Sequence, residues 1–288
     1  MSYFAGIDIG SSAIKVVILD QDSKIISKGL HKSGSDLKEA SAKALNQALD
    51  GAKLKEADIT RFAATGFGRS NCPFPNKTIT EISAHARGVY YYLKNNATMV
   101  GGLKNKSQPT IVGCNSSADF ISADSNSRTI IDIGGQDNKM IRIDASGRIL
   151  NFRMNRKCAA GTGAFLEEIA YKMDIPLPEL NRLAKLSTKP IELGSYCTVF
   201  TATEILSKIR EGIKKEDIVC GVFRSIIKRI IEMDPLTDDV ILTGGVIAHN
   251  DIIKELLSKT LNKDILVPAD PQFTGALGAA LFGTTDKH

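Results

Sequence analysis

The sequence predicts an α/β fold of two similar lobes, each with a mixed β-sheet, that enclose a cleft. Strand-like and helix-like segments alternate along the 288 residues, and one motif occurs twice at a constant offset of 124 residues (132 − 8 = 124). The first copy consists of Ile7-Asp8-Ile9-Gly10, Lys15 and Asp20, and the second of Ile131-Asp132-Ile133-Gly134, Lys139 and Asp144. A repeat at one offset indicates an internal duplication, and therefore two lobes of like construction.

The composition is that of an ordinary globular protein. Hydrophobic residues make up 43% and charged residues 24%, which argues against extended disorder, and the length is sufficient for two domain cores. No apolar run approaches the roughly 20 residues that cross a bilayer, and no cleavage site follows the start. We therefore expect a cytoplasmic protein without a membrane partner. The net charge of +5 is scattered over helices, so no nucleic-acid partner is expected.

The first lobe is expected over residues 1–94. Its elements are strands at Tyr3 to Ile9, Ala13 to Leu19 and Lys24 to Gly29, a helix, a strand at Arg61 to Ala64 and a helix at Thr80 to Leu93. The first of these helices is predicted by apolar residues at helical spacing between Leu37 and Leu49, after the N-cap residue Asp36. Residues 95–128 are rich in Ser, Asn, Gly and Lys, which indicates an inserted loop or hairpin.

The second lobe is expected over residues 129–271. Its strands are predicted at Thr129 to Ile133, on both sides of Ser146-Gly147, at Asp239 to Leu242 and at Ile265 to Val267. Its helices are predicted at Thr162 to Met173, Leu177 to Leu186, Val199 to Glu211, Asp217 to Glu232 and Ile247 to Lys259. A last helix, rich in small residues and lying within 272–284, is expected to return to the first lobe.

Each repeated strand ends in an aspartate that a glycine turn follows. Backbone N–H groups at such turns hold phosphate, because glycine lets the chain approach an anion, and carboxylates suit Mg²⁺. Two copies that face one cleft predict a site for ATP with Mg²⁺, whereas ordinary hairpin turns are the alternative. The residues assigned to phosphate are Gly10, Ser11, Ser12, Lys15, Gly134, Gly135 and Lys139, and those assigned to catalysis are Asp8, Asp132 and Gln136.

Individual roles follow from the side-chain chemistry. Gln136 is expected to orient the attacking water, and Lys15 or Lys139 to neutralise phosphate charge; the alternative is that these residues only hold their turns. A third glycine element, formed by Thr243, Gly244, Gly245 and Val246, follows a strand and opens a helix. At this distance after two phosphate loops it fits an adenosine contact.

These motifs resemble the actin, Hsp70 and hexokinase superfamily of ATPases, with two phosphate loops at Asp8 to Lys15 and Asp132 to Lys139. Three further segments narrow the resemblance: RMNRKCAAGTGAFLEEIA (Arg153 to Ala170), SYCTVFTATEI (Ser195 to Ile205) and FTGALGAALFG (Phe273 to Gly283). They are similar to the activators of 2-hydroxyacyl-CoA dehydratases and the ATPase subunits of benzoyl-CoA reductase, the BadF/BadG/BcrA/BcrD type. The resemblance covers nearly all of the chain except residues 95–128.

The five cysteines require individual interpretation. An odd number in a cytoplasmic chain does not indicate a disulfide framework, and Cys72, Cys114 and Cys220 are interpreted as small buried hydrophobes. Cys158 and Cys197 each precede a helix, whose start favours a thiolate. A 4Fe-4S cluster takes four thiolates, which two copies of the chain would supply. The resemblance implies such a homodimer, with one bridging cluster held by Cys158 and Cys197.

The function that the resemblance implies is ATP-driven electron transfer. The protein would pass one low-potential electron from ferredoxin or flavodoxin to an iron-sulfur acyl-CoA dehydratase or reductase. Two other hypotheses remain open at this point. A small-molecule (sugar) kinase of the same fold would need a carboxylate base and no cysteines, and a regulatory or filament-forming actin-like protein would need no catalysis. Bound iron would favour the electron-transfer hypothesis, whereas an iron-free monomer that phosphorylates a sugar with ATP would favour the kinase.

Overall fold

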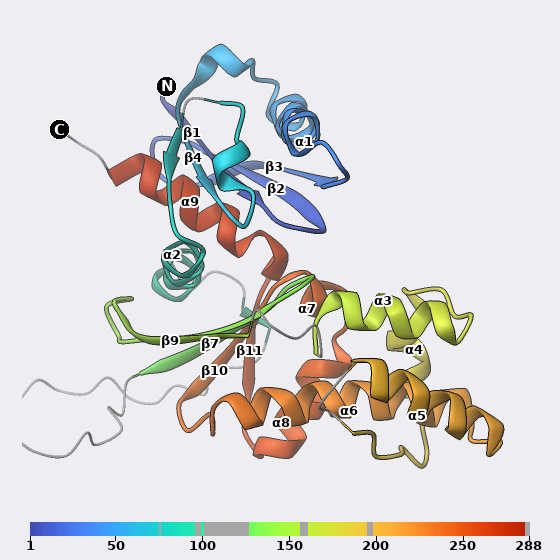
Figure 1. Ribbon diagram of the computed structural model, residues 1–288. Coiled ribbons are helices and arrows are strands. Elements are labelled where there is room, and N and C mark those ends of the chain that lie inside the picture. The colour runs from blue at the N-terminus through green and yellow to red at the C-terminus, as the bar shows by residue number, and fades with distance from the viewer. Residues whose placement is uncertain (75, 96–98, 101–126, 156–160, 195–197, 286–288) are drawn as a thin grey trace, which may run out of the picture.

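The computed structural model describes residues 1–74, 76–95, 99–100, 127–155, 161–194 and 198–285, which form two lobes (Figure 1). The first sheet has five strands in the order β3-β2-β1-β4-β5, and the second has six in the order β6-β11-β10-β7-β8-β9. Both sheets mix antiparallel hairpins with parallel neighbours. The predicted fold class, two duplicated α/β lobes with mixed sheets, is therefore confirmed.

The first lobe is a three-stranded antiparallel meander extended by two parallel strands. Its elements are β1 (Tyr3–Ile9), β2 (Ala13–Leu19), β3 (Ile25–Lys32), α1 (Leu37–Ala52), β4 (Ile59–Thr65), β5 (Asn76–Thr78) and α2 (Glu81–Lys94). Asp36 caps α1 by accepting from the backbone N–H groups of Lys38 and Glu39 at 2.9 and 3.0 Å. Strand β5 was not predicted, because its three polar residues carry no alternation of apolar and polar positions.

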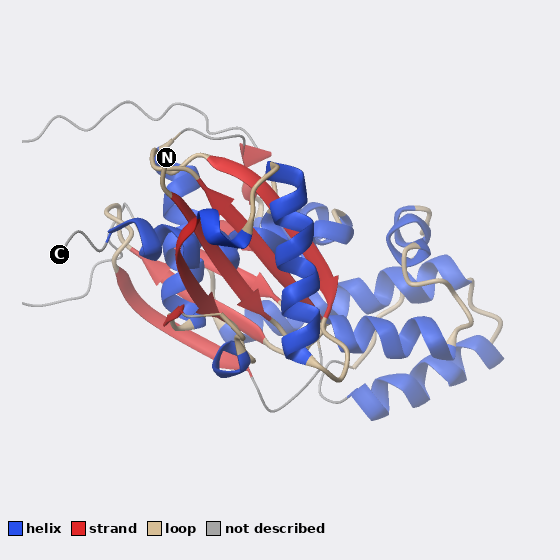
Figure 2. Ribbon diagram, turned by 90° about the horizontal axis from the view of Figure 1, so that it is seen from above, coloured by secondary structure: helices blue, strands red, loops and turns tan. Residues whose placement is uncertain are grey.

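The second lobe repeats the meander and adds a helical layer (Figure 2). Its strands are β7 (Arg128–Ile133), β8 (Asn138–Ile143), β9 (Ile149–Asn155), β10 (Asp239–Thr243) and β11 (Ile265–Pro268). Its helices are α3 (Gly163–Lys172), α4 (Glu179–Lys185), α5 (Thr198–Arg210), α6 (Lys215–Met233), α7 (Gly245–His249) and α8 (Ile252–Leu261). No helix in the described part of the chain is long and apolar enough to span a membrane.

Two elements of the second lobe differ from the sequence prediction. The helix expected at Ile247 to Lys259 is two helices, α7 and α8, because the Asn250 side chain donates to the Val246 carbonyl oxygen at 2.8 Å and ends α7. Within residues 95–128, Met99–Val100 forms strand β6, which pairs antiparallel with β11. Residues 101–126 of that segment lie outside the described residues.

The duplication extends to the backbone of the two hairpin turns. Asp20 and Asp144 each accept hydrogen bonds, all at 2.9 Å, from the N–H groups two and four residues later. The residues before the second of these donors, Ser23 and Gly147, both have positive φ, at 62° and 81°. The same backbone hydrogen-bond pattern at a constant offset indicates that the two meanders are copies of one unit.

Helices α2 and α9 (Thr274–Thr285) lie between the two lobes (Figure 1). They cross at very close range, because a Cβ atom on Gly88 would overlap the carbonyl oxygen of Thr274, and one on Gly278 would overlap that of Ala84. Helix α9 also packs on the first sheet, where a Cβ on Gly6 would overlap the Ala276 carbonyl oxygen. The C-terminal helix thus contacts both α2 and the first-lobe sheet.

Candidate functional site

A pocket of about 480 Å³ lies where the two lobes meet. It contains all of the residues that the sequence assigned to catalysis and nucleotide binding. These are Asp8, Gly10, Ser11, Ser12, Lys15, Asp132, Gly134, Gly135, Gln136, Lys139, Gly244, Gly245 and Val246. The structure therefore brings three glycine elements, which are far apart in the sequence, to one cavity.

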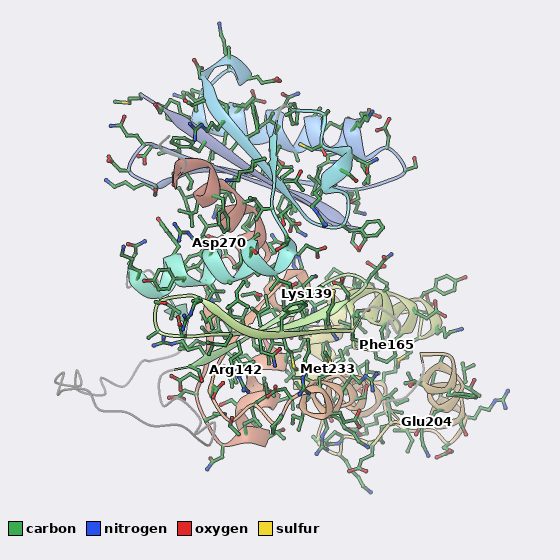
Figure 3. All side chains as sticks on the ribbon, turned by 60° about the vertical axis from the view of Figure 1, so that its left-hand side comes forward. Lys139, Arg142, Phe165, Glu204, Met233 and Asp270 are labelled. Atoms are coloured by element: carbon green, nitrogen blue, oxygen red, sulfur yellow. The ribbon has the colours of Figure 1, made fainter. Side chains whose placement is uncertain are left out.

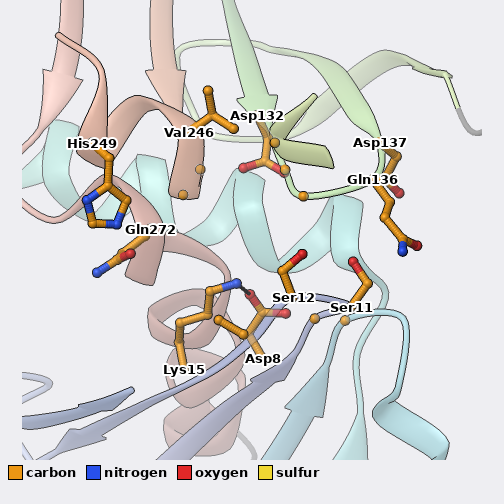
Figure 4. Close-up of a pocket in the computed structure, with 18 of the residues that line it drawn as sticks. Asp8, Ser11, Ser12, Lys15, Asp132, Gln136, Asp137, Val246, His249 and Gln272 are labelled. Atoms are coloured by element: carbon orange, nitrogen blue, oxygen red, sulfur yellow. Dashed lines mark hydrogen bonds and ion pairs between the residues drawn. The ribbon is translucent and has the colours of Figure 1, made fainter. Parts of the chain in front are cut away.

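The first hairpin contributes Asp8 and Lys15, which are direct neighbours across β1 and β2. Their side chains form a long contact of 3.5 Å between Lys15 Nζ and Asp8 Oδ2, marked in Figure 4. The Asp8 and Lys15 side chains are 11% and 15% exposed, so both reach the cavity. Among the described residues Lys15 has one carboxylate partner, Asp8, which leaves donor capacity for an anion.

The second hairpin repeats this pair as Asp132 and Lys139, but here three carboxylate groups contact the lysine. Lys139 Nζ lies 2.6 Å from Asp137, 3.0 Å from Glu81 and 3.3 Å from Asp132. Its side chain is only 5% exposed, and it lies near the middle of the molecule (Figure 3). The sequence left open whether Lys15 or Lys139 neutralises phosphate. Three carboxylates already hold the Lys139 ammonium group, whereas the Lys15 ammonium group has more donor capacity left for a phosphate.

Within this cluster, Asp132 and Lys139 each shift the pKa of the other so as to favour the charged forms. Burial raises the pKa of Asp132, but the electrostatic interactions with the neighbouring His85, Lys139 and Lys15 side chains outweigh burial and leave that pKa below its ordinary value. Burial lowers the pKa of Lys139, but the carboxylates of Asp132, Glu81 and Asp137 leave it raised. The ion pair therefore contributes stability from about pH 4 to about pH 10, and this contribution is lost as Asp132 protonates below that range or Lys139 deprotonates above it.

Across the cavity the two glycine turns touch. A Cβ atom on Gly135 of the second turn would overlap the Ser12 hydroxyl of the first, so the backbone at Gly135 lies directly against Ser12. Behind the second loop, the N–H groups of Gly163 and Ala164 at the start of α3 donate to the carbonyl oxygens of Gly134 and Gly135 at 2.9 and 2.7 Å. Helix α3 is therefore attached directly to the second glycine turn.

The third glycine element lies at another part of the cavity. Gly244 has φ of +102°, and a Cβ there would lie 2.8 Å from Asp132 Oδ1, so the turn after β10 is pressed against the second hairpin. Val246, on α7, lines the pocket, as do His249 and Gln272. These last two lie side by side, on the opposite side from Gln136 and Asp137 (Figure 4).

Two residues of α2 belong to the site although the sequence analysis did not assign them. Glu81 pairs with Lys139, and His85 Nε2 lies 3.6 Å from Asp132 Oδ2. The pocket lining includes both. Their signal in the sequence is a spacing of four residues, which places an acid and a histidine on one face of a predicted helix that is otherwise apolar on that side.

The cysteines divide into two groups. Cys158 and Cys197, assigned to the cluster, lie outside the described residues, and so does Cys114. Cys220 is buried and Cys72 is half-buried, both with free thiols. Burial raises the pKa of both these thiols. They are the neutral, unreactive kind of cysteine that their interpretation as small hydrophobes expects.

The donors around the cavity fit a nucleotide with a hard cation. Asp8 and Asp132 present carboxylates to the same space as two glycine turns, which is the combination that Mg²⁺ and phosphates use. In the described ranges no group of three or more His, Cys, Asp and Glu is arranged to hold a metal ion. A site of this kind relies on the phosphates for the remaining ligands.

Two duplicated lobes, with an aspartate and a glycine turn from each in one pocket, are the fold of the actin-like class of ATPases. A family model narrows this class, because the BadF/BadG/BcrA/BcrD ATPase family matches residues 5–108 and 110–283. The chain therefore belongs to the BadF/BadG/BcrA/BcrD ATPase family.

Similar proteins match over nearly the whole chain. The activator of lactoyl-CoA dehydratase from Anaerotignum propionicum is 37% identical over 97% of this chain and 96% of its own length. The 2-hydroxyisocaproyl-CoA dehydratase activator from Clostridioides difficile is 36% identical over 97% and 94%. A solved structure of the activator of the 2-hydroxyisocaproyl-CoA dehydratase from Clostridium difficile, with bound ADPNP, matches with a TM-score of 0.80 over 98% of this chain and 94% of that one.

Proposed function

We propose that this protein is an ATP-hydrolysing iron-sulfur activator that passes a low-potential electron to a partner acyl-CoA dehydratase or benzoyl-CoA-reductase-type enzyme. A homodimer would hold one 4Fe-4S cluster with Cys158 and Cys197 of both copies, and the cluster would supply the electron-carrying centre. Ferredoxin or flavodoxin would be the electron donor. Two relatives named as dehydratase activators, at 36% and 37% identity over 97% of the chain, support this assignment.

The observation that carries the proposal is the attachment of α3 to the second phosphate loop. Two hydrogen bonds, of 2.9 and 2.7 Å, join Gly163 and Ala164 to Gly134 and Gly135. The chain reaches Cys158 only five residues before Gly163 (163 − 158 = 5). A shift of the loop between nucleotide states would therefore be transmitted along a short stretch of chain to this cysteine. Such a switch requires ATP to bind the two states with different affinity.

The iron content tests the proposal. Anaerobically purified protein is expected to be brown and to hold about four irons per dimer, since four thiolates ligate a 4Fe-4S cluster. Cys158→Ser and Cys197→Ser are each expected to lose the bound iron while a fluorescent ADP analogue still binds. Cys72→Ser is the matched control, and it should keep the iron. A colourless, iron-free wild type that phosphorylates a sugar would contradict the proposal in favour of a kinase.

Lys15 is expected to hold phosphate in this activity. Lys15→Met should weaken ATP binding about tenfold, because one charge-assisted hydrogen bond is worth roughly 1.5 kcal/mol. The melting temperature should hardly change, since the 3.5 Å contact with Asp8 is long. Titration of a fluorescent ATP analogue would measure the affinity. Equal affinity of variant and wild type would remove Lys15 from the phosphate site.

A further inference from the structure

Thr65 and Thr243 occupy equivalent positions in the two lobes. Thr65 ends β4 and stands beside Asp8 on the parallel strand β1, and Thr243 ends β10 and stands beside Asp132 on the parallel strand β7. Each threonine precedes a glycine with positive φ, +92° at Gly66 and +102° at Gly244. The duplication therefore includes the threonine as well as the aspartate and the lysine of each lobe.

One interaction breaks this equivalence. In the second lobe the Thr243 hydroxyl donates to Asp132 Oδ1 at 3.2 Å. In the first lobe the Thr65 hydroxyl is buried, with the residue 1% exposed, and it has no hydrogen-bond partner among the residues that the structure describes. A buried hydroxyl without a partner destabilises the folded protein, because it loses its hydrogen bonds to water without replacement, so its presence here requires an explanation.

The two lysines explain why the first lobe differs. Lys139 is held by three carboxylates, which fix the Asp132 site independently of any ligand. Within the described part of the chain, Lys15 forms an ion pair with Asp8 alone, at 3.5 Å, and it faces the cavity (Figure 4). A phosphate group in the cavity offers Lys15 a stronger, doubly charged partner. Asp8 is then released from its present contact and has an unpartnered hydroxyl beside it on the next strand.

We propose that Thr65 is a positioning residue for Asp8: its hydroxyl donates to the Asp8 carboxylate once nucleotide engages Lys15, as Thr243 donates to Asp132. The first lobe is then the adaptable copy and the second the fixed copy. The bond would hold one carboxylate oxygen of Asp8, so that the other faces the metal and phosphates. The inference deepens the proposed function and rests only on its ATP-hydrolysing part.

The test is Thr65→Val, which replaces a hydroxyl by a methyl group of similar size. The variant should keep or slightly raise the melting temperature of the nucleotide-free protein, because it removes an unpartnered buried hydroxyl. The rate of ATP hydrolysis at saturation should fall roughly tenfold, with KM for ATP little changed. Mn²⁺ bound with ADP, measured by electron paramagnetic resonance, should bind several-fold more weakly. Thr65→Ser, which keeps a hydroxyl, should hydrolyse ATP and bind Mn²⁺ as the wild type does.

Thr243→Val is the matched control, because it removes a hydroxyl that already donates to buried Asp132. It should lower the melting temperature of the nucleotide-free protein, which Thr65→Val should not. The inference is overturned if Thr65→Val matches wild type in hydrolysis and Mn²⁺ binding, or if it destabilises the free protein as much as Thr243→Val. If the wild-type protein hydrolyses ATP but binds no iron, only the electron-transfer part of the proposed function is contradicted. The Thr65 and Thr243 variants would still decide the role of Thr65 in ATP hydrolysis.

Discussion

Asp8→Asn is expected to reduce the rate of ATP hydrolysis by roughly 100- to 1000-fold and to leave the fold intact. A carboxylate that holds Mg²⁺ at the phosphates contributes several kcal/mol to the transition state, and each 1.4 kcal/mol is about tenfold in rate. Asn keeps the shape of Asp8 but not its charge. Because the ion pair of Asp8 with Lys15 is long, at 3.5 Å, the melting temperature should change little.

Asp132→Asn distinguishes the two aspartates. Both carboxylate oxygens of Asp132 already have partners, Thr243 on Oδ1 and Lys139 with His85 on Oδ2, and its side chain is 5% exposed. Loss of this charge leaves a buried lysine without one of its three acids, so Asp132→Asn should lower stability as well as activity. Steady-state hydrolysis and thermal melting of both variants measure the difference. If Asp8→Asn retains near wild-type hydrolysis, Asp8 does not ligate the metal.

The residues that line the pocket were largely predictable because the same aspartate, glycine and lysine pattern occurs in both copies of the duplication. Asp8 and Asp132 occur at the same place in the same hairpin, and each hairpin has its lysine neighbour directly across the strand pair. A short-range pattern of this kind is set by local turn chemistry, which the sequence shows directly. The positions of these residues in one pocket follow once both hairpins belong to copies of one lobe.

The inequality of the two lysines was only partly predictable from the repeat. Asp137, which lies 2.6 Å from Lys139 Nζ, stands where the first copy has Ala13 (137 − 124 = 13). The rest arises because α2 crosses between the lobes and brings Glu81 and His85 against the second hairpin. A helix contact across the lobes leaves no periodic pattern in the sequence. The same holds for β6, two residues that become a strand only by pairing with β11. Tertiary contacts decide these features, whereas local sequence decides the turns and caps.

The crossing of α2 and α9 joins the lobes and depends on small residues. A Cβ atom on Gly278 would overlap the carbonyl oxygen of Ala84 and lie 2.6 Å from its carbonyl carbon. Both atoms belong to helix backbone, which cannot rotate away as a side chain can. Even the smallest substitution would therefore push the two helices apart, and α9 also lies against the first sheet at Gly6.

Gly278→Ala is accordingly expected to destabilise the protein by about 3 kcal/mol or more, at the upper end of overpacking effects. For a chain of this length that corresponds to a fall in melting temperature of roughly 5–10 °C. Gly283→Ala is the matched control on the same helix. Its Cβ would meet Phe4 at 3.7 Å, an ordinary contact, and alanine favours helix over glycine by about 1 kcal/mol. The melting temperature of Gly278→Ala should lie below that of the wild type, and that of Gly283→Ala should lie above it. Equal melting temperatures of the two variants would show that the helices can move apart without loss of stability.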